Sequence, residues 1–317
     1  MDFDLDDDDR SIQEGMRSFC AGRFPMDVVR AGELTPTVVD LGRWREIADM
    51  GLFVLGGDDG LSRRHAVLAF EELGRALVPG PLVDTALAAQ VAPEVAAGEL
   101  VAVVVEPSEA TMVVEFPAQL GALLSLGDDG VRLALQPDLD VHHVERPLDA
   151  LTPVGVVRGA LPAGDLVGDA GCAARLRTDG LLLTAAQQVG LALGATALAT
   201  AYAGGREQFG RVIGSFQAVK HLLAEMLVKA EVAKVAVHAA ACAADGSGDG
   251  DPAHLARIAK LLAGEAALFC GKTGIQVHGG MGFTWEVDAQ RYWKRACVLD
   301  THLASGDRLA EQVAATL

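Results

Sequence analysis

Hydrophobic residues in the first third of the chain recur with the period of an α-helix. The first such face consists of Ile12, Met16, Phe19, Cys20 and Phe24, spaced i, i+4, i+7, i+8 and i+12. Residues 38–50 and 61–77 repeat the pattern, Pro79-Gly80-Pro81 ends the second of them, and a short helix is expected from Val83. These segments predict a helical N-terminal domain over residues 1–98.

The middle of the chain has a different sequence pattern, in which short Val- and Leu-rich runs are separated by Pro, Gly and Asp residues. The runs are 101–105, 112–116, 131–135 and 154–157. Asp128-Asp129-Gly130 is typical of a tight hairpin turn, because Asp-Gly tolerates positive φ. We therefore expect a small β domain over residues 99–177. His142-His143 is interpreted as a surface or packing feature, since no third metal ligand lies near it in the sequence.

From about Gly180 onward the helical period returns in longer segments. Residues 181–203 are apolar nearly all round, which is typical of a helix buried in a bundle or at a subunit contact. Further helices are expected over 215–245, 253–277 and from about 288 to 313. The pattern predicts a C-terminal antiparallel four-helix bundle over residues 178–317. The fold class is α+β, mainly α.

Composition narrows the class of protein. The chain has 317 residues, 50% of them hydrophobic, with 43 acidic against 26 basic residues and a net charge of −17. These values favour a globular protein and exclude a basic nucleic-acid-binding module. An acidic start and no run of 18 apolar residues predict no signal peptide, no membrane span and a cytoplasmic location. The five cysteines lie far apart, so we expect buried free thiols and no metal site.

Candidate chemistry is confined to two segments of the C-terminal region. The chain has no GxGxxG, GxxxxGK[ST], HExxH or GxSxG motif. Residues 204–217 and 276–283 instead combine glycines with Arg and Gln side chains. Each segment alone is compatible with helix caps and surface charge. Together they favour binding of an anionic, adenine-bearing cofactor, because Arg bonds phosphate bidentately and glycine leaves backbone amides uncrowded.

These segments resemble two motifs of the acyl-CoA dehydrogenase family. Residues 201–217 are similar to its YA-xx-RxQFGxxIxxFQ motif, and residues 276–280 to its QxxGG motif. Residues 44–52 and 71–81 resemble its N-terminal helical domain. The resemblance implies an α-β-α subunit that binds FAD at a subunit interface and oxidises an acyl-CoA at Cα–Cβ. It assigns FAD binding to six residues: Arg206, Phe209, Gln217, Gln276, Gly279 and Gly280.

The sequence departs from the family at the catalytic base. The two positions where the family places its Glu hold Leu303 and Gly180. Asp179, Asp300 and Asp307 lie near those positions, but a shorter, shifted carboxylate has to reach a specific α-proton.

A second departure lies in the middle domain. Where the family has a TEPxxGSD-like segment that grips the flavin ring, residues 105–111 read VEPSEAT, in a domain that looks shortened. A chain with these departures resembles the non-catalytic subunit of heteromeric actinobacterial acyl-CoA dehydrogenases, some of which act on steroid side-chain CoA thioesters.

The resemblance implies that the chain completes an FAD site with a homologous, base-bearing subunit, in an α2β2 heterotetramer, or else with a copy of itself. Its expected partners also include an acyl-CoA substrate and an electron-transfer flavoprotein. Two alternatives stay open: a flavin monooxygenase of the same fold, which needs no α-proton base, and a purely structural subunit. The charge of −17 argues against long-range attraction of an anionic CoA thioester, so any CoA contact has to be local.

Overall fold

The computed structural model describes residues 5–35, 38–56, 62–107 and 112–316. By Cα proximity the chain divides into two compact units. The helical unit comprises Met1–Ala21, Val67–Val78 and Leu182–Leu317, and the mixed unit comprises Gly22–Ala66 and Pro79–Leu181. Helices dominate and small sheets lie in the middle of the chain, which confirms the expected fold class. The division into domains 1–98, 99–177 and 178–317 stays a prediction.

The first third is helical, as expected. Its α-helices are α1 (Asp7–Arg23), α2 (Met26–Gly32), α3 (Leu41–Asp49), α4 (Arg63–Arg75), α5 (Leu82–Ala89) and α6 (Pro93–Ala96). The pattern did not indicate α2 and α6, which are short and carry little periodicity. After α4, Gly80 has a φ of 120°, and a side chain there would collide with the ring of Trp44.

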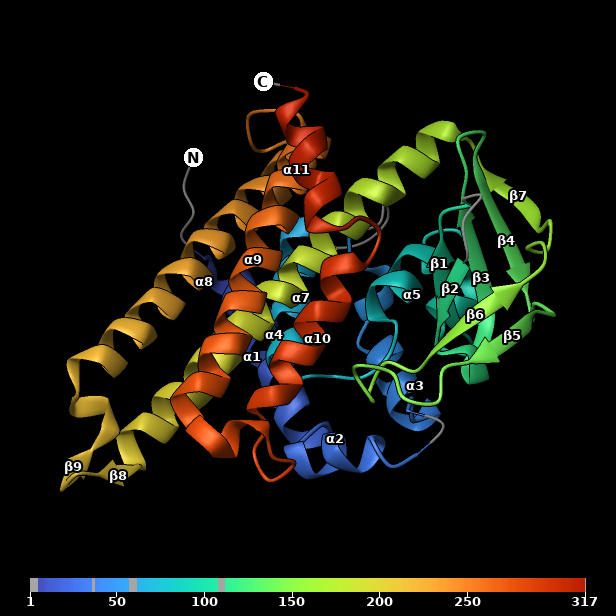
Figure 1. The fold of residues 1–317 in the computed structure, drawn as a ribbon. Coiled ribbons are helices and arrows are strands. Elements are labelled where there is room, and N and C mark those ends of the chain that lie inside the picture. The colour runs from blue at the N-terminus through green and yellow to red at the C-terminus, as the bar shows by residue number, and fades with distance from the viewer. Residues whose placement is uncertain (1–4, 36–37, 57–61, 108–111, 317) are drawn as a thin grey trace. The chain divides into compact units, whose positions relative to one another are not determined.

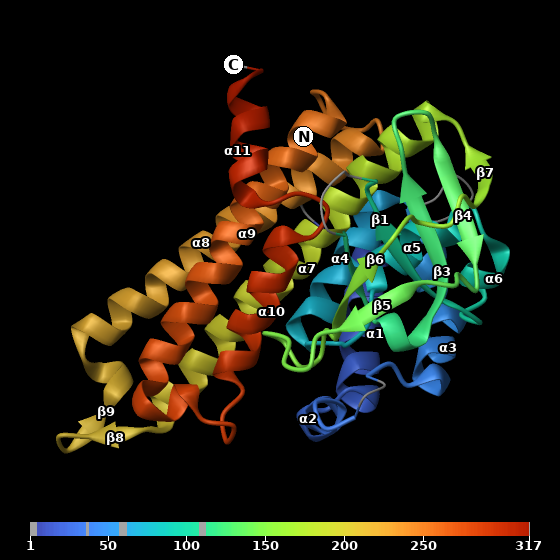
Figure 2. The ribbon, with the colours of Figure 1, turned by 45° about the vertical axis from the view of Figure 1, so that its right-hand side comes forward.

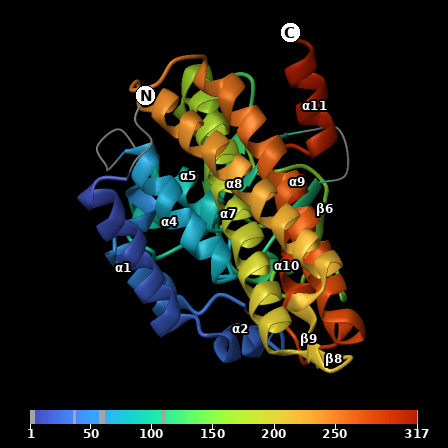
Figure 3. The ribbon, with the colours of Figure 1, turned by 90° about the vertical axis from the view of Figure 1, so that its left-hand side faces the viewer.

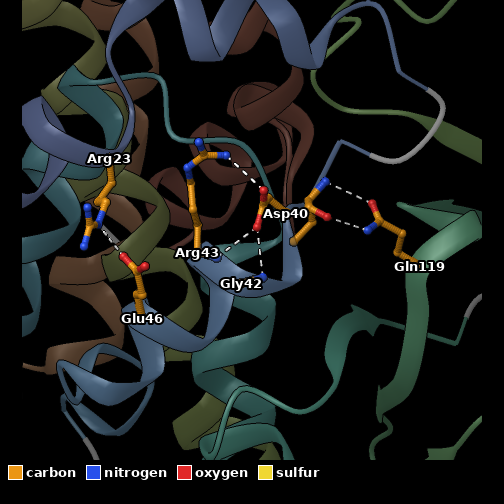
Figure 4. Close-up of polar contacts among 7 residues, drawn as sticks. Arg23, Asp40, Gly42, Arg43, Glu46 and Gln119 are labelled. Carbon is orange, nitrogen blue, oxygen red and sulfur yellow. Dashed lines mark hydrogen bonds and ion pairs between the residues drawn. The ribbon is translucent and has the colours of Figure 1, made fainter.

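Polar contacts determine where α3 begins and hold the segment before it in place (Figure 4). Asp40 Oδ1 accepts hydrogen bonds from the backbone N–H groups of Gly42 (2.9 Å) and Arg43 (3.0 Å). This N-cap starts the helix at Leu41, three residues later than the apolar pattern predicts. The Gln119 side chain binds the Val39 backbone twice, accepting from its N–H at 3.0 Å and donating to its carbonyl at 2.7 Å.

The middle of the chain forms two sheets in the mixed unit (Figures 1 and 2). Their strands are β1 (Val101–Val105), β2 (Met112–Glu115), β3 (Leu120–Leu126), β4 (Val131–Leu135), β5 (Asp140–His143), β6 (Val154–Arg158) and β7 (Asp165–Gly168). One sheet has the order β1-β3-β4-β7, with β1 and β3 parallel, and the other has the order β2-β6-β5. The expected Asp-Gly turn joins β3 to β4, with Gly130 at a φ of 147°.

The C-terminal half consists of long helices (Figures 1 and 3). They are α7 (Ala170–Gly205), α8 (Gln217–Ala244), α9 (Pro252–His278), α10 (Ala289–Thr301) and α11 (Gly306–Ala314). In the helical unit α9 packs against both α8 and α10. α7 begins eleven residues before the expected Leu181, because residues 170–180 carry polar side chains that hide their helical period but contain no proline, and their two glycines do not end the helix.

The last expected helix, from about 288 to 313, is in fact two helices. α10 ends at Thr301, Leu303 adopts a φ of 59°, and the Ser305 hydroxyl caps α11 by accepting from the Arg308 N–H at 3.4 Å. The buried Lys260 ammonium donates to the carbonyls of Asp300 (3.1 Å) and Ala304 (2.7 Å). Continuous apolar spacing concealed this break, although Ser305-Gly306-Asp307 is a recognisable helix start.

The length and composition of α7 are sufficient for a membrane span, which differs from the expectation drawn from uninterrupted apolar runs. Its most apolar 18-residue window, however, is 83% buried inside the fold. Within the helical unit α4 crosses it closely, because a Cβ at Gly74 or Gly190 would collide with a backbone carbonyl of the other helix. α7 is therefore a core helix of the fold, mostly buried by the rest of the chain.

Candidate cofactor site

The first candidate segment begins where α7 ends and turns back through a two-stranded hairpin. Strands β8 (Glu207–Gln208) and β9 (Arg211–Val212) pair antiparallel, with Gln208 opposite Arg211. This register leaves Phe209 and Gly210 as a two-residue turn, and their φ angles are 53° and 75°. Positive φ at both positions is the type I′ geometry that such hairpins prefer. The turn carries Phe209 outward, so that it is 93% exposed.

Aromatic and cationic contacts connect the hairpin to α8. The Phe209 and Phe216 rings lie edge to face with centroids 6.2 Å apart, and the Arg211 guanidinium lies 4.1 Å from the Phe216 ring centroid. The backbone of Arg206 is held on both sides, since its N–H donates to Tyr202 and its carbonyl accepts from Ile213. The Arg206 side chain is exposed, and no ion pair is recorded for it within the part of the chain that the structure describes.

The second candidate segment is the C-terminal end of α9. Gln276 is exposed, and the helix ends at His278 where Gly279 takes a φ of 61° and a ψ of −140°. This conformation is essentially restricted to glycine. A Cβ at Gly279 or at Gly280 would have no atom within 4 Å, so the backbone here is open to an approaching ligand.

One aromatic contact joins the two segments. The rings of Tyr202, near the end of α7, and His278 are stacked with centroids 4.2 Å apart and 29° between their planes. His278 is buried, and its Nδ1 lies 2.7 Å from the Gly274 carbonyl, which can only accept, so Nδ1 carries the proton. The structure thus brings the segments of all six predicted residues to one end of the bundle, with all six exposed.

The two residues at which the sequence analysis expects the family base, Leu303 and Gly180, have no side-chain group that accepts a proton. Leu303 lies in the turn between α10 and α11, and Gly180 lies within α7. Asp179 is buried, and Arg63 donates to both of its oxygens, at 2.7 and 3.3 Å. Burial raises the pKa of the Asp179 carboxyl, and Arg63 opposes the rise. Asp179 thus has a structural partner in the mixed unit.

The other two carboxylates lie at the break between α10 and α11. Asp307 is exposed in the first turn of α11, where a negative charge favours the helix. A Cβ at Gly264 would lie 2.8 Å from Asp300 Oδ1, so this carboxylate approaches α9 inside the bundle. Burial lowers the pKa of the neighbouring Lys260 to about 8. Sequence reasoning missed Lys260, because no local pattern distinguishes a buried lysine from a surface one.

The other residues considered in the sequence analysis lie outside these two segments. His142 and His143 are exposed on β5. Residues 108–111 of the VEPSEAT segment lie outside the described residues, whereas Glu106 pairs with Arg177 at 2.8 Å. All five cysteines are free thiols, but two of them, Cys172 and Cys297, are only half-buried. A cavity of about 370 Å³ lies beside α2 and α3 and is lined largely by apolar side chains, Phe24, Val29 and Trp44 among them.

Comparisons with known proteins identify the class. Residues 179–314 match the family model described as "Acyl-CoA dehydrogenase, C-terminal domain". Acyl-CoA dehydrogenase IpdE2 of Mycolicibacterium smegmatis is 33% identical over 85% of this chain and 86% of its own length. Acyl-CoA dehydrogenase FadE34 of Mycobacterium tuberculosis is 34% identical over 86% of this chain, which spans only 42% of that longer protein.

Solved structures share the fold across the whole chain. The Tcur3481-Tcur3483 steroid ACAD G363A variant superposes with a TM-score of 0.84 at 24% identity, covering 97% of both chains. The ChsE4-ChsE5 complex from Mycobacterium tuberculosis superposes with a TM-score of 0.83 at 22% sequence identity, covering 99% of this chain and 98% of the other. The structure of PigA with FAD and proline superposes with a TM-score of 0.84 at 17% sequence identity, covering 100% of this chain and 99% of the other.

The fold and sequence together place this chain in the acyl-CoA dehydrogenase family. FAD is the cofactor of that family. The local structure fits the adenosine and pyrophosphate side of such a molecule, because an exposed arginine, two exposed amide side chains and two glycines with open space lie at one end of the bundle.

Proposed function

We propose that this chain is a subunit of a flavin-dependent acyl-CoA dehydrogenase and that it contributes one side of an FAD site. The supporting observation is that all six predicted residues are exposed at one end of the bundle. A cofactor bound there by this chain alone would remain open to water. We therefore infer that a homologous subunit covers it.

Each residue has a role that suits its chemistry. Arg206 forms a bidentate contact with the pyrophosphate, and the amides of Gln217 and Gln276 offer donors and acceptors to the adenosine side. Gly279 and Gly280 let the backbone approach the same part of the cofactor. Phe209, at the tip of its turn, provides an apolar surface. Bound FAD supplies the acceptor for the hydride that leaves Cβ of the substrate.

The missing base explains why a partner is required. The α-proton of a thioester leaves at neutral pH only toward a base within hydrogen-bond reach, and such a base contributes about 10²- to 10⁴-fold to the rate. Leu303 and Gly180 cannot accept a proton, and Asp179 is already paired with Arg63. We infer that the homologous subunit supplies the base, in an α2β2 assembly.

The relatives suggest the substrate class. The Tcur3481-Tcur3483 structure is a steroid ACAD. We propose a steroid-derived CoA thioester as substrate, with an electron-transfer flavoprotein as electron acceptor and the cytoplasm as location.

The test compares the chain alone with the chain co-purified with a base-bearing homologue from the same genome. Arg206→Ala should lose about 2 kcal/mol or more of FAD binding, roughly 30-fold in affinity, whereas Arg206→Lys should lose less. Full FAD occupancy in the assembled Arg206→Ala complex would overturn the cofactor assignment. Ordinary turnover of straight-chain, branched or steroid acyl-CoAs by the chain alone would overturn the need for a partner. A bound flavin that no acyl-CoA reduces would point to the monooxygenase alternative.

A further inference from the structure

The cavity beside α2 and α3 has no part in the proposed function. It measures about 370 Å³, and every described residue of its lining belongs to the mixed unit. The six candidate FAD residues all belong to the helical unit. Because a water molecule takes up about 30 Å³ in the liquid, the cavity has room for roughly twelve waters or for one small organic molecule.

Most of the cavity wall is apolar. Phe24, Val29 and Trp44 contribute buried side chains to it, and Pro79 contributes a half-buried one. Water against such a wall makes fewer hydrogen bonds than it makes in bulk, so an apolar molecule displaces it favourably. A largely apolar lining with a few polar groups is also the usual composition of a small-molecule site.

Polar contacts outside the cavity hold its wall in place (Figure 4). The Gln119 side chain bonds both backbone groups of Val39, and the Asp40 carboxylate caps α3. An ion pair joins Arg23, the last residue of α1, to Glu46 on α3. Since the wall is already fixed in this way, a ligand can bind without the cost of ordering it.

The polar side chains of the lining determine which polar group a ligand can carry. Asp40 and Arg43 are the only charged residues among the described residues of the lining, and they pair at 3.0 Å, so together they carry no net charge. Both Asp40 oxygens accept hydrogen bonds, whereas Arg43 has five N–H donors on its side chain and Asp40 as its one recorded side-chain partner in the described ranges. The Trp44 indole N–H has no recorded acceptor among the described residues either. The lining therefore favours a neutral ligand that accepts a hydrogen bond.

We propose that this cavity binds a compact, neutral, apolar molecule with one carbonyl oxygen, and that this oxygen accepts a hydrogen bond from the Arg43 guanidinium. The hydrocarbon part of the ligand lies against Phe24, Val29 and Trp44. The phosphates of a CoA thioester find no unpaired positive charge in this lining, so the ligand is not an acyl-CoA and the inference does not rest on the proposed function.

The test is a fluorescence titration of the full chain with trans-1-decalone, a neutral bicyclic ketone. Trp44 is one of three tryptophans, and the other two, Trp285 and Trp293, lie in the helical unit. Decalone should change the tryptophan emission to saturation, and Trp44→Phe should abolish that change. Decahydro-2-naphthoate, a carboxylate with the same ring system, should bind at least about tenfold more weakly, because burial of an unpaired charge is costly.

Substitutions separate the apolar wall from the polar contact. Val29→Phe fills the cavity and should abolish binding, whereas the control Val113→Phe, at an exposed position on β2 of the same unit, should not. Arg43→Met should weaken decalone binding by about fivefold or more, and Arg43→Gln, which keeps side-chain N–H donors, should weaken it less. Circular dichroism checks the helices of each variant. Val28→Phe, at a half-buried position of the lining, replaces Val29→Phe if that chain misfolds.

The assignment of the cavity is overturned if the folded wild-type chain shows no saturable decalone binding, if a folded Val29→Phe chain binds as the wild type does, or if the saturating signal survives in Trp44→Phe. Equal affinity for the ketone and the carboxylate would refute the neutral class of ligand, and unchanged affinity in Arg43→Met would refute the hydrogen bond. None of these results bears on the FAD occupancy of the Arg206→Ala complex, so failure of this proposal is distinguishable from failure of the proposed function.

Discussion

The Tyr202 ring stacks on the His278 imidazole with centroids 4.2 Å apart, and this contact joins the two segments that carry the candidate cofactor residues. Tyr202 lies one turn before the end of α7, and His278 is the last residue of α9. Arg206 lies four residues after Tyr202 and Gly279 directly follows His278, so the stack lies beside both candidate cofactor segments.

We expect Tyr202→Ala to weaken FAD binding without unfolding the chain. A ring pair of this kind contributes about 0.5–1.5 kcal/mol beyond the burial of its area, so FAD affinity should fall roughly 2- to 12-fold. Tyr202→Phe keeps the ring and should bind nearly as the wild type does. Fluorescence titration with FAD in the assembled complex measures both. Equal losses in the two variants would show that the hydroxyl matters and the stack does not.

Gly280→Val should separate cofactor binding from stability. A Cβ at Gly280 has no neighbour within 4 Å in this chain, so unfolding by denaturant should be nearly unchanged, whereas FAD occupancy should drop because the side chain fills the space left for the cofactor. Gly15→Ala is the control, since Gly15 lies within α1 with the same open space. A Gly280→Val complex with full FAD content contradicts the assignment.

Lys260 should make stability depend on pH in the alkaline range. Burial lowers its pKa in the folded chain from 10.5 to about 8. Between these values the unfolded chain binds more protons than the folded one, so the free energy of unfolding rises with pH. Relative to Lys260→Met, which cannot titrate, the wild type should gain on the order of 3 kcal/mol between pH 8 and 10.5. Parallel urea denaturation series check this, and a constant difference across the range would refute it.

Local sequence patterns predicted most elements of this fold. The run at residues 131–135 is a strand with the same bounds, and Asp128-Asp129-Gly130 makes the expected turn. One prediction failed at a place where a side chain from a distant segment contributes. The break after α10 depends in part on Lys260, which satisfies carbonyls at Asp300 and Ala304 from another helix. The residues near the break do not include Lys260, so this contact could not be predicted from the local sequence.

At the candidate site, too, the sequence predicted the local motifs but not the contact between them. The motifs around Arg206 and Gly279 were recognisable because glycines, Arg and Gln at fixed spacing suit a phosphate-bearing ligand. The contact between the two segments through the Tyr202 and His278 rings could not be predicted from the sequence, because stacking depends on how α7 and α9 pack.

By itself, then, the sequence determined that the chain is mainly helical. It also predicted that two glycine-containing segments bind the cofactor and that Leu303 and Gly180 stand where the family places its base. Only the tertiary structure decided which apolar helix faces are buried. The apolar run at residues 181–203 allows a helix buried in a bundle or at a subunit contact, and in the structure neighbouring helices bury most of it, whereas α8 leaves Val228, Val232 and Val235 exposed. The physical reason is that periodicity defines the apolar faces of a helix, whereas their burial depends on the other helices that pack against it.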